Sequence, residues 1–217
     1  MDHKESPQDQ INSIIELFSS GQTQEALDNI EALTKNNPNE PLLFNISGVF
    51  YKQIGELDEA IKRFEKAIAI NPDYAEAHNN LGVTLQNLGL MDEAVISYEK
   101  AIASNPDYAE AHNNLGVTLQ NLGLMDEAVI SYEKVLVSNP DHATAHNNLG
   151  NIFMGLKQLD AAVKSYEKVI AINPDFPDAH YNLGNALREL GQLEDAIKSY
   201  EKVIAINPDF PDAHYNL

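Results

Sequence analysis

The stretch AEAHNNLGVTLQNLGLMDEAVISYEK occupies residues 75–100 and occurs again, letter for letter, at residues 109–134. The two copies begin 34 residues apart, and the same interval separates six prolines. A repeat of this length is typical of solenoid proteins, in which each unit contacts only its neighbours. Copying a unit preserves those contacts, so the duplication predicts one lengthened array. The prolines are Pro38, Pro72, Pro106, Pro140, Pro174 and Pro208.

Each unit consists of two helical segments separated by a glycine. In the first segment of one unit, His78, Leu81 and Leu85 follow the spacing that lines one face of a helix. Ala94 and Tyr98 continue that pattern in the second segment. Each unit is therefore predicted to form a helix hairpin. The dividing glycines are Gly21, Gly55, Gly89, Gly123 and Gly191.

This pattern resembles the tetratricopeptide repeat family, whose signature is W-x2-L-G-x2-Y, then A-x3-F, then P. The resemblance implies an all-α fold, a right-handed α-solenoid or superhelix of stacked antiparallel helix hairpins. One unit matches the signature through Phe44, Gly48, Tyr51, Ala60, Phe64, Ala67 and Pro72, and the next through His78, Leu81, Gly82, Leu85, Ala94, Tyr98, Ala101 and Pro106.

The same period predicts the organisation of the whole chain. Residues 1–6 are expected to be a flexible N-terminus, and residues 7–40 a degenerate N-terminal capping repeat. Residues 211–217 correspond to a truncated first helix of a further repeat. Between them lie five complete units, at residues 41–74, 75–108, 109–142, 143–176 and 177–210.

Two departures from the family signature matter for the fold. Lys157 takes the place of a turn glycine, so this helix end should carry strain of about 1 kcal/mol or be capped differently. Histidine replaces the first bulky aromatic residue, and we expect these rings to pack between helices. Equivalent residues of successive repeats lie about 10 Å apart, which is too far to share a metal ion. The histidines are His78, His112, His146, His180 and His214.

Composition restricts the partners. Fourteen basic and 33 acidic residues give a formal charge of −19, which disfavours nucleic acid and anionic membranes. The chain has no cysteine, no apolar run of membrane-spanning length and no export signal, so a cytoplasmic location is expected. Candidate catalytic Ser, His, Asp and Glu residues recur with the repeat, as scaffold residues do. No enzyme activity, cofactor or metal site is therefore predicted.

The face opposite the buried stripe of each first helix is rich in amides. In the tetratricopeptide repeat family this face lines the concave groove, and a similar asparagine ladder in protein O-GlcNAc transferases holds an extended peptide. The alternative is that these asparagines serve hydrogen bonding between helices. The predicted peptide-binding residues are Asn45, Asn79, Asn80, Asn113, Asn114, Asn147, Asn148 and Asn182.

These features favour a non-catalytic interaction module that binds extended peptide or protein segments. Acidic groove positions such as Glu76 and Glu110 favour neutral or basic partners and disfavour a lysine- and arginine-rich clamp for chaperone tails. One alternative is the N-terminal recognition arm of a larger glycosyltransferase or sulfotransferase.

A second alternative is a self-assembling scaffold. The last complete unit has a helix whose buried stripe meets only the short segment 211–217. An uncovered apolar strip there would favour a homodimer through the C-terminal end. The predicted self-association residues are Leu193, Ile197, Tyr200 and Ile204.

Overall fold

The computed structural model describes residues 6–217, and every regular element in that range is an α-helix. The segment expected to be flexible, residues 1–6, lies outside the described residues except for Ser6. The chain divides into two compact units, Met1–Ala111 and His112–Leu217. In the described range, no helix has both the length and the apolar character needed to span a bilayer.

The helices alternate between 13 and 14 residues until the short last one. They are α1 (Pro7–Ser19), α2 (Thr23–Asn36), α3 (Pro41–Gln53), α4 (Leu57–Ile70), α5 (Ala75–Asn87), α6 (Met91–Ser104), α7 (Ala109–Asn121), α8 (Met125–Ser138), α9 (Ala143–Gly155), α10 (Leu159–Ile172), α11 (Pro177–Glu189), α12 (Leu193–Ile206) and α13 (Pro211–Asn216).

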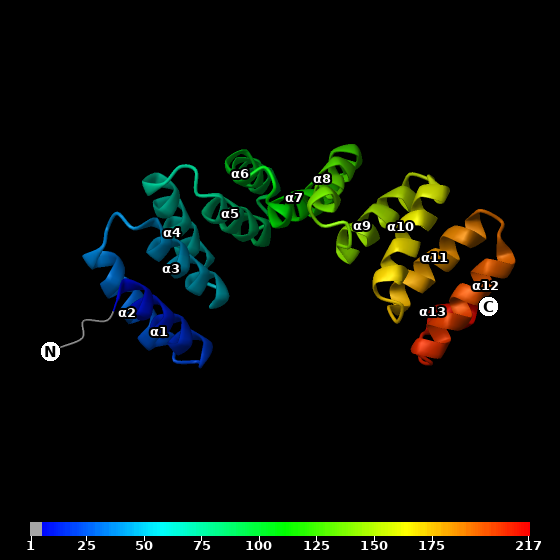
Figure 1. Ribbon diagram of the computed structural model, residues 1–217, viewed down its shortest axis with the longest axis horizontal. Helices are drawn as coiled ribbons and strands as arrows, with labels where there is room; N and C mark the ends of the chain where they lie inside the picture. Colours follow the sequence, from blue (N-terminus) through cyan, green and yellow to red (C-terminus); the bar gives the residue numbers. More distant parts are fainter. Residues whose placement is uncertain (1–5) are drawn as a thin grey trace. The chain divides into compact units, whose positions relative to one another are not determined.

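Within each unit, consecutive helices fold back on one another (Figure 1). In the first unit α1 packs against α2, α3 against α4 and α5 against α6, and contacts between α2 and α3 and between α4 and α5 join these pairs. In the second unit α9 packs against α10 and α11 against α12, with α8–α9, α10–α11 and α12–α13 contacts between pairs. The predicted all-α fold of stacked helix hairpins is confirmed.

A glycine and an aromatic ring lie in the core of each hairpin from α3–α4 to α11–α12, whereas isoleucines fill the corresponding places of α1 and α2. A Cβ atom added to Gly82 would lie 2.6 Å from Cε1 of Tyr98, so only glycine lets this ring lie against the first helix. Tyr98 is fully buried. Hydrophobic burial on this scale is the main stabilising term of each repeat. The equivalent pairs are Gly48 with Phe64, Gly116 with Tyr132, Gly150 with Tyr166, and Gly184 with Tyr200.

The turn between the two helices of a hairpin needs a left-handed residue. Gly89 has φ +78°, a conformation that glycine adopts without steric cost. Lys157 has φ +58° at the corresponding place, and it is the one non-glycine residue with positive φ in the described range. Of the two alternatives that the sequence left open, a different cap or strain, the left-handed φ and the glycine-like turn bonds at Lys157 favour strain. Its Nζ lies 2.7 Å from Oε2 of Glu189, at the end of α11.

The histidines close the loops that join successive repeats. Nε2 of His78 lies 2.9 Å from the carbonyl oxygen of Pro72. Because a carbonyl oxygen only accepts hydrogen bonds, Nε2 carries the proton and donates. In residues 6–217 no three His, Asp or Glu side chains gather into a metal-binding group. Equivalent histidine–carbonyl contacts, each 2.8 Å long, join His146 to Pro140, His180 to Pro174, and His214 to Pro208.

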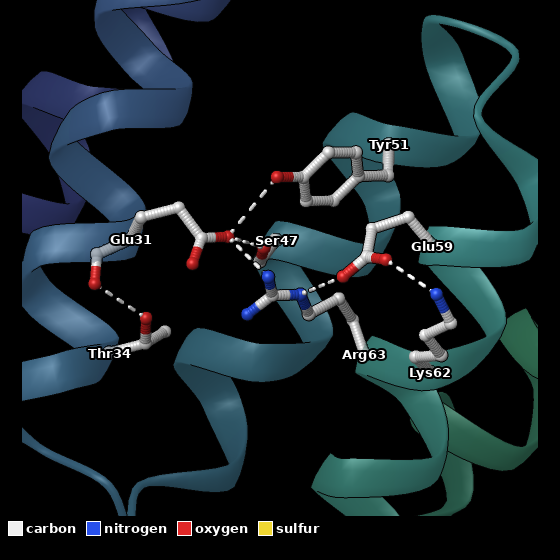
Figure 2. Close-up of polar contacts among 7 residues, drawn as sticks. All are labelled: Glu31, Thr34, Ser47, Tyr51, Glu59, Lys62 and Arg63. Carbon is white, nitrogen blue, oxygen red and sulfur yellow. Dashed lines mark hydrogen bonds and ion pairs between the residues drawn. The ribbon is translucent and has the colours of Figure 1, made fainter.

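Two sets of polar contacts stabilise the N-terminal repeat. Ser6 and Asp9 form a capping box at the start of α1, in which each side chain bonds the other residue's backbone N–H. Figure 2 shows the second set, in which Oε1 of Glu31 on α2 accepts a hydrogen bond from Arg63 on α4 at 2.9 Å. The hydroxyls of Ser47 and Tyr51 on α3 lie 3.3 Å from the same oxygen. This network ties α2 to the next hairpin.

Candidate functional site

The predicted asparagines occupy two neighbouring positions of the first helix in each repeat. We call the fifth-position residues the inner row and the sixth-position residues the outer row. The outer-row residues are all partly exposed, whereas Asn45 and Asn79 of the inner row are 6% and 1% exposed. The inner row comprises Asn45, Asn79, Asn113 and Asn147, and the outer row Asn80, Asn114, Asn148, Asn182 and Asn216.

Hydrogen bonds link the outer row to the inner row of the preceding repeat. Nδ2 of Asn80 donates to Oδ1 of Asn45 at 3.1 Å. At the other end of the chain, Nδ2 of Asn216 donates to the hydroxyl oxygen of Tyr181, which holds the inner-row position of its repeat, at 3.3 Å. Arg188 donates to Oδ1 of Asn216 at 2.8 Å. Hydrogen bonding between helices is therefore one role of these asparagines.

In the first unit, tyrosines from the inter-repeat loops complete the inner row. Nδ2 of Asn45 lies 3.4 Å from the hydroxyl oxygen of Tyr74, and Asn79 is hydrogen-bonded to Tyr108. Nδ2 of Asn79 also donates to Oε1 of Glu110 at 3.1 Å. Burial, with a smaller contribution from nearby glutamates, raises the pKa of both tyrosines to about 12. Their hydroxyls therefore stay neutral and can both donate and accept.

In the second unit the inner row is less complete. The side-chain oxygens of Asn113 and Asn147 are buried and have no hydrogen-bond partner among the described residues. Asn148 bonds the hydroxyl of Tyr132, a residue of the preceding repeat's second helix. Asn182 makes no side-chain hydrogen bond in the described part of the chain. A buried acceptor without a partner costs about 1–3 kcal/mol. A hydrogen-bond donor from a ligand would therefore be favourable at the side-chain oxygens of Asn113 and Asn147.

A cavity of about 250 Å³ adjoins one of these two asparagines. It lies between the start of α9 and the loop that follows α10. None of its lining residues carries a charge. The lining residues are Ala143, Thr144, Asn147, Asn173 and Phe176.

The core tyrosines also reach the amide-rich face, which sequence reasoning missed by treating them as core alone. The hydroxyl of Tyr98 donates to Oε1 of Gln86 at 2.8 Å, and that of Tyr200 donates to Oδ1 of Asn185 at 2.9 Å. The signal was tyrosine in place of the family's phenylalanine, because a buried hydroxyl needs a partner. Tyr132 and Tyr166 make the equivalent bonds to Gln120 and Asn151.

The residues predicted for self-association lie in different environments. Leu193 and Ile197 on α12 are 58% and 41% exposed, and Ile204 is partly buried. Tyr200 is 1% exposed, because its ring packs with Leu187 in the core of its own repeat. Of the predicted residues, Leu193 and Ile197 therefore contribute exposed apolar surface, and Tyr200 does not.

Family models of the tetratricopeptide repeat match most of the chain. One model, described as a TPR repeat, matches residues 48–89, 91–123, 150–188 and 184–217. Two others, described as tetratricopeptide repeats, match residues 109–142 and 75–105. No curated protein matches the chain.

Solved structures share the fold. YrrB, described as a TPR protein with an unusual peptide-binding site, has a TM-score of 0.76 at 22% identity, covering 86% of this chain and 96% of its own. MamA has a TM-score of 0.74 at 26% identity, covering 83% and 97%. PilF of Pseudomonas aeruginosa has a TM-score of 0.80 at 15% identity, covering 96% and 95%.

Proposed function

The chain belongs to the tetratricopeptide repeat family, and from that premise we propose that it is a non-catalytic module that binds extended peptide or protein segments along its asparagine rows. The observation that carries this proposal is the spare hydrogen-bonding capacity of Asn80 and Asn182 in the outer row. After donating to Asn45, the partly exposed Asn80 retains its oxygen and one N–H. Asn182 retains its full capacity.

The repetition suits an extended ligand. First helices stacked about 10 Å apart advance by about three residues of an extended chain, at about 3.3 Å per residue. The asparagine side-chain amide of each repeat can then hydrogen-bond to every third peptide group of the ligand. The amide offers both a donor and an acceptor, which are the groups that a peptide backbone presents.

Charge favours neutral or basic segments. Glu76 and Glu110 are exposed at the start of their first helices, and Asp178 holds the same position in a later repeat. With a formal charge of −19, the protein attracts cationic segments and repels nucleic acids and anionic lipids.

The decisive experiment uses Asn182→Ala, because this asparagine makes no internal hydrogen bond that the substitution would break. Peptides of twelve residues, selected from a random library against the intact chain, are measured by calorimetry. We expect Asn182→Ala to weaken their binding by about 1–2 kcal/mol with the melting temperature unchanged. Glu99→Ala and Glu133→Ala, at exposed sites on second helices, are the matched controls. Full affinity in Asn182→Ala, or an equal loss in the controls, would remove the asparagine rows from the proposal.

Self-association is a second candidate function, favoured by exposed apolar side chains near the C-terminal end. Leu193 is 58% exposed, Tyr215 90% and Leu217 52%. Large exposed apolar surface often marks an interaction site. We expect light scattering at about 100 μM to detect a dimer that Leu193→Lys converts to a monomer. A monomer at that concentration without the substitution would exclude this candidate.

A further inference from the structure

The cavity beside Asn147 differs from its counterparts in the first unit. There, each inner-row asparagine has a loop tyrosine beside it, at Tyr74 for Asn45 and at Tyr108 for Asn79. In the repeat that contains Asn147 the loop residue is Phe176, which has no hydroxyl. In the first unit Oδ1 of Asn45 accepts from Asn80, whereas the loop tyrosine accepts from Nδ2 of Asn45. The oxygen of Asn147 has no such donor, because Asn182 does not donate to it.

From this geometry we propose that the cavity formed by Ala143, Thr144, Asn147, Asn173 and Phe176 is a subsite for one residue of an extended peptide, taking an uncharged apolar side chain and a backbone N–H. This inference rests on the proposed peptide-binding function and defines the ligand chemistry at one point. The peptide N–H donates to Oδ1 of Asn147, and the ligand side chain packs against Phe176.

Three observations support this ligand chemistry. The buried oxygen of Asn147 accepts a donor without losing an existing bond, and the amide torsion of asparagine is soft enough to turn that oxygen toward the cavity. The lining is uncharged, so a charged side chain would be desolvated there without a partner. The volume of about 250 Å³ exceeds that of a single water site, so the space suits a side chain.

The test uses N-acetyl-leucine N′,N′-dimethylamide, whose one N–H is that of leucine, as the ligand and NMR of the side-chain amide of Asn147, identified by its loss in Asn147→Asp. We expect this signal to shift saturably at millimolar ligand. The same compound methylated on the leucine nitrogen cannot donate and should shift it at least fivefold less.

Phe176→Tyr supplies the hydroxyl that the first unit has at this place. Its hydroxyl should occupy the cavity and hydrogen-bond the side-chain amide of Asn147, as that of Tyr74 does with Asn45. It should raise the melting temperature by about 2–4 °C and reduce the ligand-induced shift at least fivefold. Phe210→Tyr is the matched control, because Phe210 packs at 5.2 Å against Tyr181 and has no inner-row asparagine beside it. It should change neither measurement. Thr144→Leu, which fills the cavity from α9, is a second variant that should also suppress the shift.

Three results would overturn the subsite: no shift with the parent ligand, an equal shift with the methylated ligand, or a shift that persists in both Phe176→Tyr and Thr144→Leu. A water molecule that satisfies Asn147 would give the first of these. None of them bears on the library peptides and Asn182→Ala, so failure of the subsite is distinguishable from failure of the proposed function.

Discussion

At the scale of single residues, each complete repeat from residue 41 onward depends on one glycine that permits close approach of an aromatic ring. The Gly82 pair with Tyr98 and the Gly150 pair with Tyr166 would each have a contact below 3 Å if a Cβ were added. Gly155 shows the opposite situation, because a Cβ there would meet nothing within 4 Å. The same residue type therefore serves packing at one place and contributes only flexibility at another.

Gly82→Ala should destabilise the protein by about 1–3 kcal/mol, because the new methyl group overlaps the ring of Tyr98 and forces it off its packing position. Gly155→Ala should stabilise it by about 0.5–1 kcal/mol, since φ is not positive there and alanine restricts the unfolded chain. Urea denaturation measures both. A loss of stability in Gly155→Ala similar to that in Gly82→Ala would contradict the assignment of close packing to Gly82.

A second residue-scale prediction concerns alkaline pH. Burial raises the pKa of Tyr132 to about 12, against about 10 in the unfolded chain. Between these values the unfolded state loses its proton first, so the stability present below pH 10 falls as pH rises toward 12. We expect the urea unfolding free energy of Tyr132→Phe to decline less steeply between pH 9.5 and 11 than that of the parent. Tyr215→Phe, at a side chain 90% exposed, is the control, and an equal change of slope in both variants would refute the prediction.

At the scale of elements, the first hairpin is joined to the second by charged and polar groups as well as by apolar packing. Arg63 on α4 bonds Glu59 on its own helix at 3.1 Å and Glu31 on α2 at 2.9 Å, and its guanidinium lies 5.5 Å from the ring centre of Tyr51. The Arg63 side chain is 20% exposed, so its contacts are less screened than those of surface pairs. These contacts add to the apolar packing between the two hairpins.

Arg63→Met should lower stability by about 1–2 kcal/mol, because it removes the cationic partner of Glu31 while keeping much of the apolar stem. Lys62→Met is the matched control, since Lys62 is 68% exposed and, within residues 6–217, pairs only with Glu59. We expect less than about 0.5 kcal/mol there. Hydrogen exchange should show faster opening of α1 and α2 in Arg63→Met alone, and equal protection of both helices in the two variants would argue against the proposed link.

At the scale of the whole molecule, the 34-residue period was enough to predict the helix hairpins and to identify Lys157 as the residue at a turn that otherwise takes glycine. Those features follow from local spacing and from glycine positions, which a sequence states directly. The same information placed the asparagines on one face of each first helix. It could not rank them, because residues at the fifth and sixth positions differ by only 100° around the helix.

Contacts with the neighbouring repeat determine which asparagine is buried, and the helical spacing of the sequence does not predict these contacts. Asn79 is 1% exposed because Glu110 and Tyr108 of the following segments cover it, whereas the adjacent Asn80 stays accessible. Tyr200 was expected in an uncovered strip because it belongs to the apolar stripe that faces the short segment 211–217. Its ring instead lies against Gly184 of its own hairpin and is buried. Such outcomes are set by tertiary packing rather than by periodicity.

The bonds between histidine and the proline carbonyl have a consequence for acid tolerance. Nε2–H is present in the neutral ring that donates to Pro72, and protonation of the ring adds a proton at Nδ1 while leaving that donor in place. A loop held by a carboxylate would lose its bond as the carboxylate became neutral. The loops at His78, His146, His180 and His214 are instead held by an N–H group that the imidazole ring has in both its neutral and its charged form, so the donor of this hydrogen bond is present in either form.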